Sequence, residues 1–407
     1  MRRASFQGRV NRILAVLFVA AIALMSVMTL LTKWDEIYDA VRRMDYLRAY
    51  LPEHWNGMDL FNARLRSLES KLGGALWKSE ELGYVNSAFQ YALGKKMINT
   101  GGSQMVKLNT GHLYDLQGPV SAVPKVSEIA DLKDLLDPNL PFLFVYEHPV
   151  VYDEGMFPEG YEKLDYGTEF ADEAVSLMRA RGIDTIDSRE VLNASGYSYD
   201  ELLLKTDQHW TTLAAIVMAR EIAREAAEKT GLPIDPNRID PEGFETKVYE
   251  KLFLGKYGQR VGTGLIDPDD IVVYWPAYET EMRRETFYLG QMLNGEGSFR
   301  EAIVRWDKLE RGRSGYNINA YMDYGLTENY EHIENRTAPR ARILLLKDSY
   351  SAPIGAFLSL TASDVYAVDM RRSNRTFPEL VEEFEPDIVV VAYSQQMLRD
   401  ENYQFVG

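Results

Sequence analysis

The chain has 407 residues, of which 46% are hydrophobic and 26% charged, enough to bury one large core or two ordinary ones. Its net charge of -16 and sequence pI of about 4.9 exclude binding to nucleic acid or anionic lipid headgroups through charge. Because the chain has no cysteine, a thiol nucleophile, a disulfide framework and a Cys-based zinc site are excluded as well.

The first 32 residues read as a membrane anchor. Several arginines precede an uncharged, apolar run over residues 13–31. As a helix this run is roughly 28 Å long, which is enough to cross the hydrocarbon core of a bilayer. The basic flank predicts a single-pass anchor with its N-terminus in the cytoplasm and the bulk of the chain extracytoplasmic. A cleaved signal peptide is the alternative, although its apolar region is normally shorter and ends at a small-residue cleavage site.

Beyond the anchor we expect two regions. Residues 33–95 contain apolar residues at helical spacing and predict a helical stalk or an N-terminal helical layer. Residues 96–407 predict an α/β domain, in which the first clear strand is an apolar, aromatic-rich run at 141–147. A helix over 170–181 and a strand at 183–187 complete a first βαβ unit, and a further helix is expected from residue 212 to about 229.

The C-terminal part repeats the same alternation. Strands are predicted at 342–347, 365–369 and 387–393, separated by helices at about 353–360 and 377–384. Such a series is typical of a parallel sheet with helices on both faces, whose ligands bind beyond the carboxyl ends of the strands. The less regular stretch at about 233–340 is interpreted as an insertion over that edge of the sheet.

Three residues carry the candidate chemistry. Asp207 and His209 stand two residues apart just before a predicted helix, so from a loop both side chains can reach one point. Ser349 follows a buried-looking strand and precedes a helix, where backbone N–H groups can hold a developing oxyanion. A carboxylate, an imidazole and a hydroxyl at the end of a strand are the parts of a serine acyl-transfer site.

Other interpretations of these residues stay open. Ser349 is also suited to cap the following helix, and Asp207 with His209 suits a metal, although no His-Glu-x-x-His pair supplies further ligands. No phosphate-loop or dinucleotide fingerprint is present, so no cofactor is expected. Four residues at or just after predicted strand ends are candidates for substrate binding: His148, Tyr350, Arg371 and Tyr393.

Several of these stretches together resemble a known family. Residues 206–211 (Thr-Asp-Gln-His-Trp-Thr), followed by Leu-Ala-Ala at 213–215, resemble the signature of the DHHW family, and are similar also to alginate O-acetylation proteins of the AlgX/AlgJ type. Residues 342–351 resemble that family's serine block, and Val-Asp-Met-Arg at 368–371 resembles the strand and arginine that follow it. Two more stretches look family-like: 253–258 and 270–274.

The resemblance covers roughly residues 95–400 and implies an SGNH-hydrolase-like (flavodoxin-like) fold. It implies Ser349 as nucleophile, His209 as base and Asp207 as the acid that orients His209. In ordinary GDSL esterases the serine precedes the Asp-x-His pair, so the order here resembles a circular permutation. This sequence departs from the pattern at Gln208, where the family name expects a second His, and at Lys347, where the GDSL motif has Gly.

By the same resemblance the chain is expected to be a membrane-anchored, extracytoplasmic serine O-acetyltransferase or acetylesterase. Its expected substrate is a cell-surface or secreted polysaccharide, and its expected partner is a membrane-bound O-acyltransferase. The alternative is a non-catalytic polysaccharide-binding or assembly subunit that keeps the fold. The catalytic hypothesis requires Ser349 Oγ to lie within about 3–4 Å of His209, with His209 beside Asp207.

Overall fold

The computed structural model describes residues 2–34, 78–100, 103–148, 151, 153–288, 291–325, 330–373 and 375–400. It separates into two compact units, residues 1–90 and residues 91–407. Most of the predicted stalk at 33–95 falls on residues 35–77, which lie outside the described residues.

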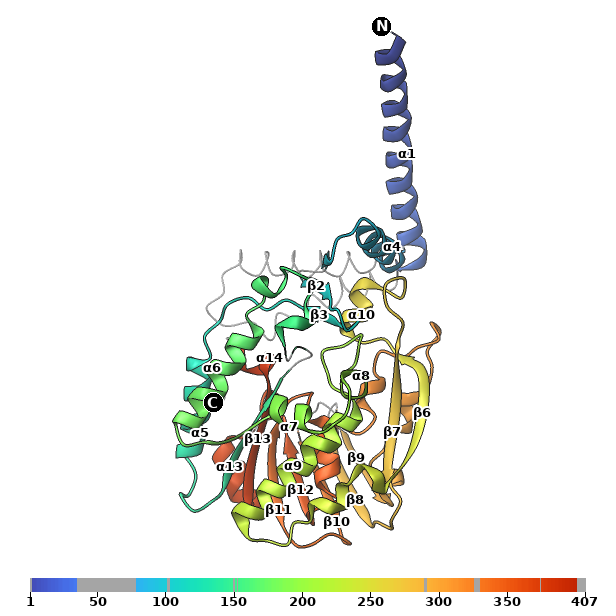
Figure 1. Cartoon of the computed structure of the whole chain (residues 1–407). Helices are drawn as coiled ribbons and strands as arrows, with labels where there is room; N and C mark the ends of the chain where they lie inside the picture. Colours follow the sequence, from blue (N-terminus) through green and yellow to red (C-terminus); the bar gives the residue numbers. More distant parts are fainter. Residues whose placement is uncertain are drawn as a thin grey trace, which may run out of the picture. The chain divides into compact units, whose positions relative to one another are not determined.

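The first unit begins with one long helix, α1 (Arg2–Thr32) (Figure 1). Its segment Ala15–Thr32 has a mean hydropathy of 2.4 and is long and apolar enough to cross a membrane, a test that an N-terminal signal sequence passes too. The predicted apolar N-terminal helix is therefore confirmed, while its orientation in a membrane stays a prediction. A second helix, α4 (Ser79–Ala92), spans the boundary between the two units.

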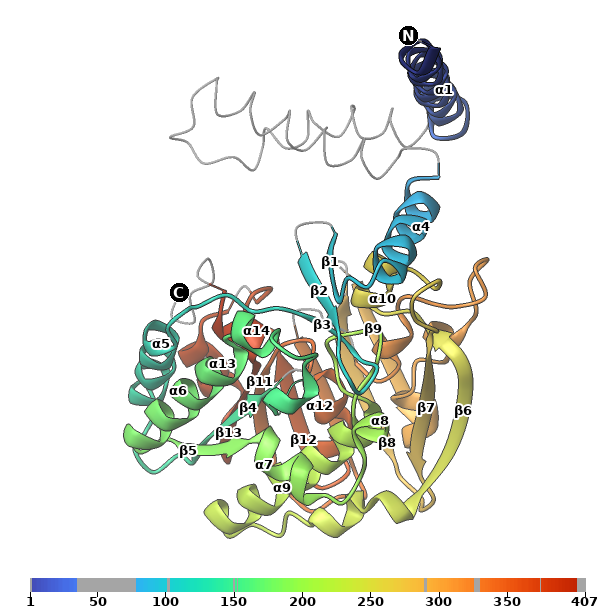
Figure 2. The same ribbon diagram turned by 45° about the horizontal axis from the view of Figure 1, so that its top comes forward.

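The second unit is built on an eight-stranded sheet in the spatial order β5-β4-β13-β11-β12-β10-β8-β9. Figure 2 labels its strands β5, β4, β13, β11 and β12. The first five strands in this order run parallel. The last three are added antiparallel. The strands are β4 (Phe142–Glu147), β5 (Asp184–Asp187), β8 (Met282–Tyr288), β9 (Gln291–Gly297), β10 (Tyr330–Asn335), β11 (Arg342–Lys347), β12 (Asp364–Val368) and β13 (Ile388–Ser394).

The order of the parallel strands explains the unusual order of the motifs. Counted from β11 as the first strand, β12-β11-β13-β4-β5 reads 2-1-3-4-5, which is the flavodoxin-like order. In the chain, however, β4 and β5 precede β11. The strands thus have the same neighbours as in a flavodoxin-like sheet, but the chain forms the fourth and fifth strands before the first three. This confirms the SGNH-like fold with permuted motif order.

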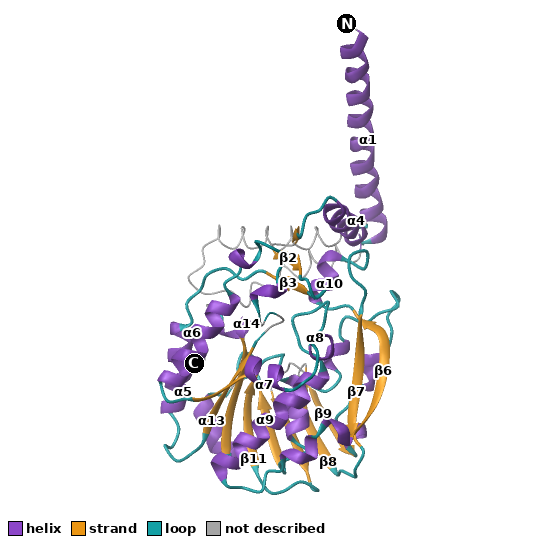
Figure 3. Cartoon of the chain, in the orientation of Figure 1, coloured by secondary structure: helices purple, strands orange, loops and turns teal. Residues whose placement is uncertain are grey.

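Strand residues alternate between two cores, one on each face of the sheet. On β11, Ile343 and Leu345 belong to one buried cluster, and Leu344 and Leu346 to the other. The first face is covered by α7 (Ser188–Ala194), α9 (Thr212–Thr230) and α12 (Ala352–Leu358). The second is covered by α5 (Val123–Asp134), α6 (Gly167–Ala180) and α13 (Phe377–Phe384). Figures 2 and 3 show α9 and α6 on opposite sides of the strands.

The stretch at 233–340, predicted as an insertion, plays two structural parts. Strands β8 to β10 extend the central sheet, which the sequence did not predict. Strands β6 (Phe244–Phe253) and β7 (Asp269–Pro276) pair separately, joined through the short helix α10 (Lys256–Val261). The remaining elements are β1 (Met97–Thr100), β2 (Ser103–Lys107), β3 (Leu113–Asp115), α8 (Tyr199–Leu202), α11 (Phe299–Ala302), α14 (Gln395–Leu398) and several 3-10 turns.

Candidate functional site

The Asp-x-His pair lies in a short loop between α8 and α9 that is fixed at both ends. An isolated bridge pairs Leu203 with Trp210, and the Thr211 hydroxyl accepts the amide of Ala214 to cap α9. Within this loop Asp207 Oδ1 accepts the backbone N–H of His209 at 3.1 Å and lies 2.5 Å from His209 Nδ1. The loop conformation therefore directs both side chains to one point, as the two-residue spacing predicts.

Ser349 meets this pair from the end of β11. Its Oγ lies 2.9 Å from His209 Nε2, which meets the distance that the catalytic hypothesis requires. The preceding Asp348 holds the turn, because its Oδ1 accepts the amide of Tyr350 at 2.8 Å and its Oδ2 accepts the amide of Ser394 at 3.0 Å. Because Asp207 accepts a hydrogen bond from Nδ1–H of His209, Nε2 can accept a hydrogen bond from the Ser349 hydroxyl.

The far side of Asp207 rests on the start of α10. Asp207 Oδ2 accepts the backbone N–H of Lys256 at 2.5 Å, and the amide of Gly255 donates to Thr206 Oγ1 at 2.8 Å. A β-carbon at 255 would overlap the Asp207 side chain, so this approach requires glycine. The sequence singled out residues 253–258 only as family-like; their contact with the acid was not predicted.

The pKa values of two neighbouring acids, Asp207 and Asp269, shift in opposite directions. Burial opposes ionisation of Asp207, but the charge and hydrogen bond of His209, together with the amides of Lys256 and His209, outweigh it and lower the pKa of Asp207. Burial raises the pKa of Asp269 to about 6, although that carboxyl accepts the amides of Lys205 and Thr206 at 2.7 and 2.9 Å. Asp269 thus anchors the loop from β7, a role that no motif indicated.

Two tyrosines hold the imidazole ring in place. Tyr321 stacks on His209 with ring centroids 4.7 Å apart and an interplanar angle of 20°, and Tyr350 packs against it at 4.6 Å. The Tyr350 hydroxyl donates to the carbonyl of Gln208 at 2.8 Å, and Trp210 Nε1 donates to the carbonyl of Tyr350 at 3.1 Å. Tyr321, from the irregular stretch, had no periodic signal that could have identified it.

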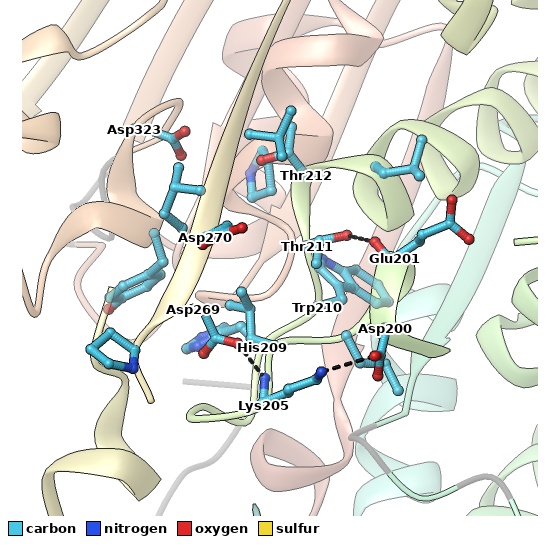
Figure 4. A pocket seen from close by; sticks show the side chains of 18 of the residues that line it. Asp200, Glu201, Lys205, His209, Trp210, Thr211, Thr212, Asp269, Asp270 and Asp323 are labelled. Atoms are coloured by element: carbon cyan, nitrogen blue, oxygen red, sulfur yellow. Dashed lines mark hydrogen bonds and ion pairs between the residues drawn. The ribbon is translucent and has the colours of Figure 1, made fainter. Parts of the chain in front are cut away.

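His209 and Ser349 open into a pocket of 460 Å³ (Figure 4). Its wall combines aromatic residues, aliphatic residues and carboxylates. Its lining residues include Asp200, Glu201, Lys205, Trp210, Asp267, Asp269, Asp270, Tyr274, Tyr321 and Asp323. Of the four residues predicted to bind substrate, Tyr350 lines this pocket, with its side chain buried against His209.

The other three predicted residues lie elsewhere in the described structure. His148 is buried and its amide donates to Ser188 Oγ at 2.9 Å. Arg371 forms two hydrogen bonds to the carboxylate of Asp369, at 2.8 and 2.6 Å. Tyr393 is buried in the core on the second face of the sheet. All three residues lie near strand ends, as predicted. Their side chains, however, are buried elsewhere or paired with a neighbouring residue, so they do not line the pocket.

In the part of the chain that the structure describes, no third metal ligand accompanies Asp207 and His209. Among the described residues, the side chains close enough together to hold a metal jointly are His332, Glu334 and Asp364, from β10 and β12. None of these three lines the pocket of Ser349. Asp207 instead contacts the His209 imidazole and backbone amides, and His209 contacts the Ser349 hydroxyl. This arrangement suits proton transfer.

Comparisons with known proteins confirm the resemblance found in the sequence. Residues 140–266 match a family model described as an SGNH hydrolase-like domain, acetyltransferase AlgX. A DHHW family protein from Eubacterium siraeum aligns with a TM-score of 0.57 and 18% identity, over 76% of this chain and 95% of that chain. Bacillus cereus PatB1 with a sulfonyl adduct aligns with a TM-score of 0.57 and 15% identity, over 75% of this chain and all 100% of that chain.

At these identities the structural likeness shows a shared fold. The O-acetyltransferase domain of Pseudomonas putida AlgJ aligns at a lower TM-score of 0.42, with 18% identity over 74% of this chain and 93% of that domain. Comparison with curated protein sequences finds no match. The family match covers the first βαβ unit, the Asp-x-His loop and α10, and it ends before β11 and Ser349.

Proposed function

We propose that this chain is a membrane-anchored serine O-acetyltransferase or acetylesterase that acts on a polysaccharide outside the cytoplasm. The observation that carries the proposal is the continuous contact from Asp207 through His209 to Ser349 at the mouth of a pocket. Ser349 is the nucleophile, His209 the general base and Asp207 the acid that orients His209. The match to a family model described as an acetyltransferase supports the choice of acyl group.

The proposed reaction proceeds in two steps. His209 Nε2 takes the Ser349 proton as Oγ attacks the acetyl carbonyl, and the same proton then passes to the departing oxygen of the donor. This leaves an acetyl ester on Ser349 and a free alcohol. In the second step His209 deprotonates a sugar hydroxyl or water, which attacks the ester and restores the Ser349 hydroxyl. A sugar acceptor makes the protein a transferase, and water makes it an esterase.

The oxyanion formed in each step needs a hydrogen-bond donor. The backbone N–H of Ser349 donates to no acceptor among the described residues and lies on the nucleophile itself, so we assign it to this task. Asp207 stays ionised, because its pKa is lowered, and it therefore stabilises the imidazolium that forms when His209 takes the proton.

The location and partner follow from the anchor and from the acetyl group. With α1 in the membrane and the basic residues in the cytoplasm, the pocket lies outside the cell, where activated acetyl donors such as acetyl-CoA are not free. A membrane-bound O-acyltransferase that passes the acetyl group across the membrane supplies Ser349 in this scheme. Co-purification of the full-length protein with its membrane neighbours tests the partnership.

The catalytic assignment is tested by acetyl release from p-nitrophenyl acetate with the full-length protein in a neutral detergent. We expect Ser349→Ala to lower the rate at least 100-fold, because Ser349 is the group that forms the acetyl ester in this scheme. Ser127→Ala is the matched control, since Ser127 lies on α5 with its hydroxyl bonded to the carbonyl of Val123 at 3.0 Å. Equal rates in wild type and Ser349→Ala would overturn the catalytic assignment and favour the non-catalytic alternative.

A sulfonyl fluoride provides a second readout that does not depend on turnover. The PatB1 structure with a sulfonyl adduct shows that a protein of this fold accepts such a group. Sulfonyl fluorides react with activated hydroxyls, so we expect a single mass increase in wild type that is absent from Ser349→Ala. Labelling that persists in Ser349→Ala would place the reactive hydroxyl elsewhere.

A further inference from the structure

The pocket beside Ser349 carries an excess of acids over bases. Among the described residues that line it, six are acidic and one, Lys205, is a lysine. The Lys205 ammonium is already paired with Asp200 at 2.8 Å. At the rim, the Asp267 carboxylate pairs with Lys251 at 2.7 Å, while exposed Glu201 and Asp270 add two further carboxylates. Among the described lining residues, a ligand in this pocket therefore meets acceptors and negative charge, without an unpaired lysine or arginine.

The same wall offers apolar surface suited to a sugar ring. Trp210, Tyr274 and Tyr321 present aromatic groups, and aliphatic side chains from β7 lie beside them. Carboxylates accept hydrogen bonds from sugar hydroxyls, which are donors. One more polar group awaits a partner: Asp323 is 2% exposed, and its Oδ2 forms no hydrogen bond among the described residues. A buried, unpartnered carboxyl lining a pocket indicates a polar ligand group beside it.

We propose that the sugar unit bound here is uncharged, and that the carboxylates around the pocket exclude uronates. The inference rests on the proposed function, because it names the substrate class of that site. A uronate carboxylate would lose water on entering the pocket and would be repelled by the carboxylates there. The net charge of -16 would also repel it at a distance. Rejection by built-in repulsion is a common source of specificity.

The test compares two acceptors of equal length, a neutral gluco-oligosaccharide and an oligogalacturonate, with p-nitrophenyl acetate as donor and full-length protein in neutral detergent. Mass spectrometry of the acetylated products measures the ratio of kcat/KM values. We expect the neutral acceptor to be preferred at least tenfold at low salt, with a smaller ratio in 0.5 M NaCl because salt screens the repulsion. Equal use of both, or preference for the uronate, would overturn the proposal.

Two variants change the charge of the pocket in a designed way. Asp200→Asn leaves the Lys205 charge uncompensated, and Asp267→Asn does the same for Lys251. We expect each to raise the relative use of the uronate at least threefold. Glu382→Gln, an exposed acid on α13, makes the same change in net charge away from the pocket and should leave the ratio unchanged. An unchanged ratio in both pocket variants would contradict the proposed cause.

A charged ester separates failure of this inference from failure of the proposed function. The leaving group of a donor ester occupies the place from which an acceptor attacks, because the second step is the reverse of the first. If neither sugar is acetylated, cleavage of 3-carboxy-4-nitrophenyl acetate is compared with p-nitrophenyl acetate, each relative to its rate in hydroxide. A tenfold lower Ser349-dependent rate for the carboxylated ester supports the exclusion of anions. Equal Ser349-dependent rates for the two esters overturn the proposed exclusion. Cleavage of both esters that does not depend on Ser349 overturns the proposed function itself.

Discussion

The carboxylate of Asp207 lies so close to the backbone of Gly255 that no β-carbon fits between them. A β-carbon built at 255 would lie 2.7 Å from Asp207 Cγ, and nearer still to Cβ and Oδ2. This contact brings the amide of Lys256 onto Asp207 and links the start of α10 to the triad. The orientation of the acid is thus decided by a residue 48 positions away, at 255 against 207.

Replacing this glycine should damage catalysis without a similar loss of folding. In Gly255→Ala, Asp207 or the start of α10 has to shift, and a displacement of about 1 Å at a catalytic group costs on the order of 100-fold in rate. We expect kcat/KM for p-nitrophenyl acetate to fall by about that factor. Gly243→Ala is the control, because a β-carbon there meets nothing within 4 Å. Wild-type activity in a folded Gly255→Ala protein would contradict the assigned role.

We predict that Tyr321 positions His209, because its ring stacks on the imidazole. Removing the ring in Tyr321→Leu leaves the imidazole free to tilt, and we expect kcat to fall about tenfold. Tyr321→Phe keeps the ring and should retain most of the activity, since no hydrogen bond of the Tyr321 hydroxyl occurs among the described residues. Steady-state kinetics with both variants check this, and equal loss in the two would show that the hydroxyl, not the ring, matters.

Asp323 should make the protein less stable as the pH rises. Burial raises its pKa from 3.8 to about 8, so between these values the folded chain binds a proton that the unfolded chain has released. The free energy of unfolding therefore falls with rising pH in this window, by at most about 1.4 kcal/mol per unit, and the loss is complete above pH 8. Asp323→Asn removes the titration.

Thermal unfolding of the full-length protein in detergent, followed from pH 5 to pH 9, measures this effect. We expect Asp323→Asn to melt above the wild type, by a small margin at pH 5 that grows up to about pH 8. Glu382→Gln, which alters an exposed acid, should follow the wild-type curve throughout. Parallel curves for Asp323→Asn and wild type would show that Asp323 titrates at an ordinary pKa.

The absence of cysteine makes the membrane topology directly measurable. A single cysteine in Ser121→Cys lies on an exposed position of the second unit, and one in Ser5→Cys lies before the apolar run. In spheroplasts, a membrane-impermeant maleimide should label Ser121→Cys and should reach Ser5→Cys only after the membrane is opened, because basic flanks stay in the cytoplasm. Labelling of Ser5→Cys in sealed spheroplasts would reverse the orientation, and a chain without residue 5 would indicate cleavage.

Much of the parallel sheet could be predicted because its signals are local. Strands buried on both faces need continuous apolar runs, and the runs predicted at 141–147 and 342–347 correspond to β4 and β11. The antiparallel extension had no such signal, since β8 and β10 bury charge. Arg284 and Glu331 are both buried and form an ion pair that exists only when the two strands are neighbours. Charged residues in a sequence indicate exposure until their partner is known.

The chemistry of the candidate site could be predicted from the chain alone, because Asp207 and His209 share one loop and Ser349 comes two residues after the end of a strand. A spacing of two residues and the end of a strand are properties of the chain alone. Three contacts of the site are visible only in the folded protein. Ser349 lies beside His209, the backbone of residues 255–256 contacts Asp207, and Tyr321 stacks on the imidazole. These contacts join segments far apart in the chain, and their geometry depends on the order of the strands and the packing of both sheet faces, which local patterns do not encode.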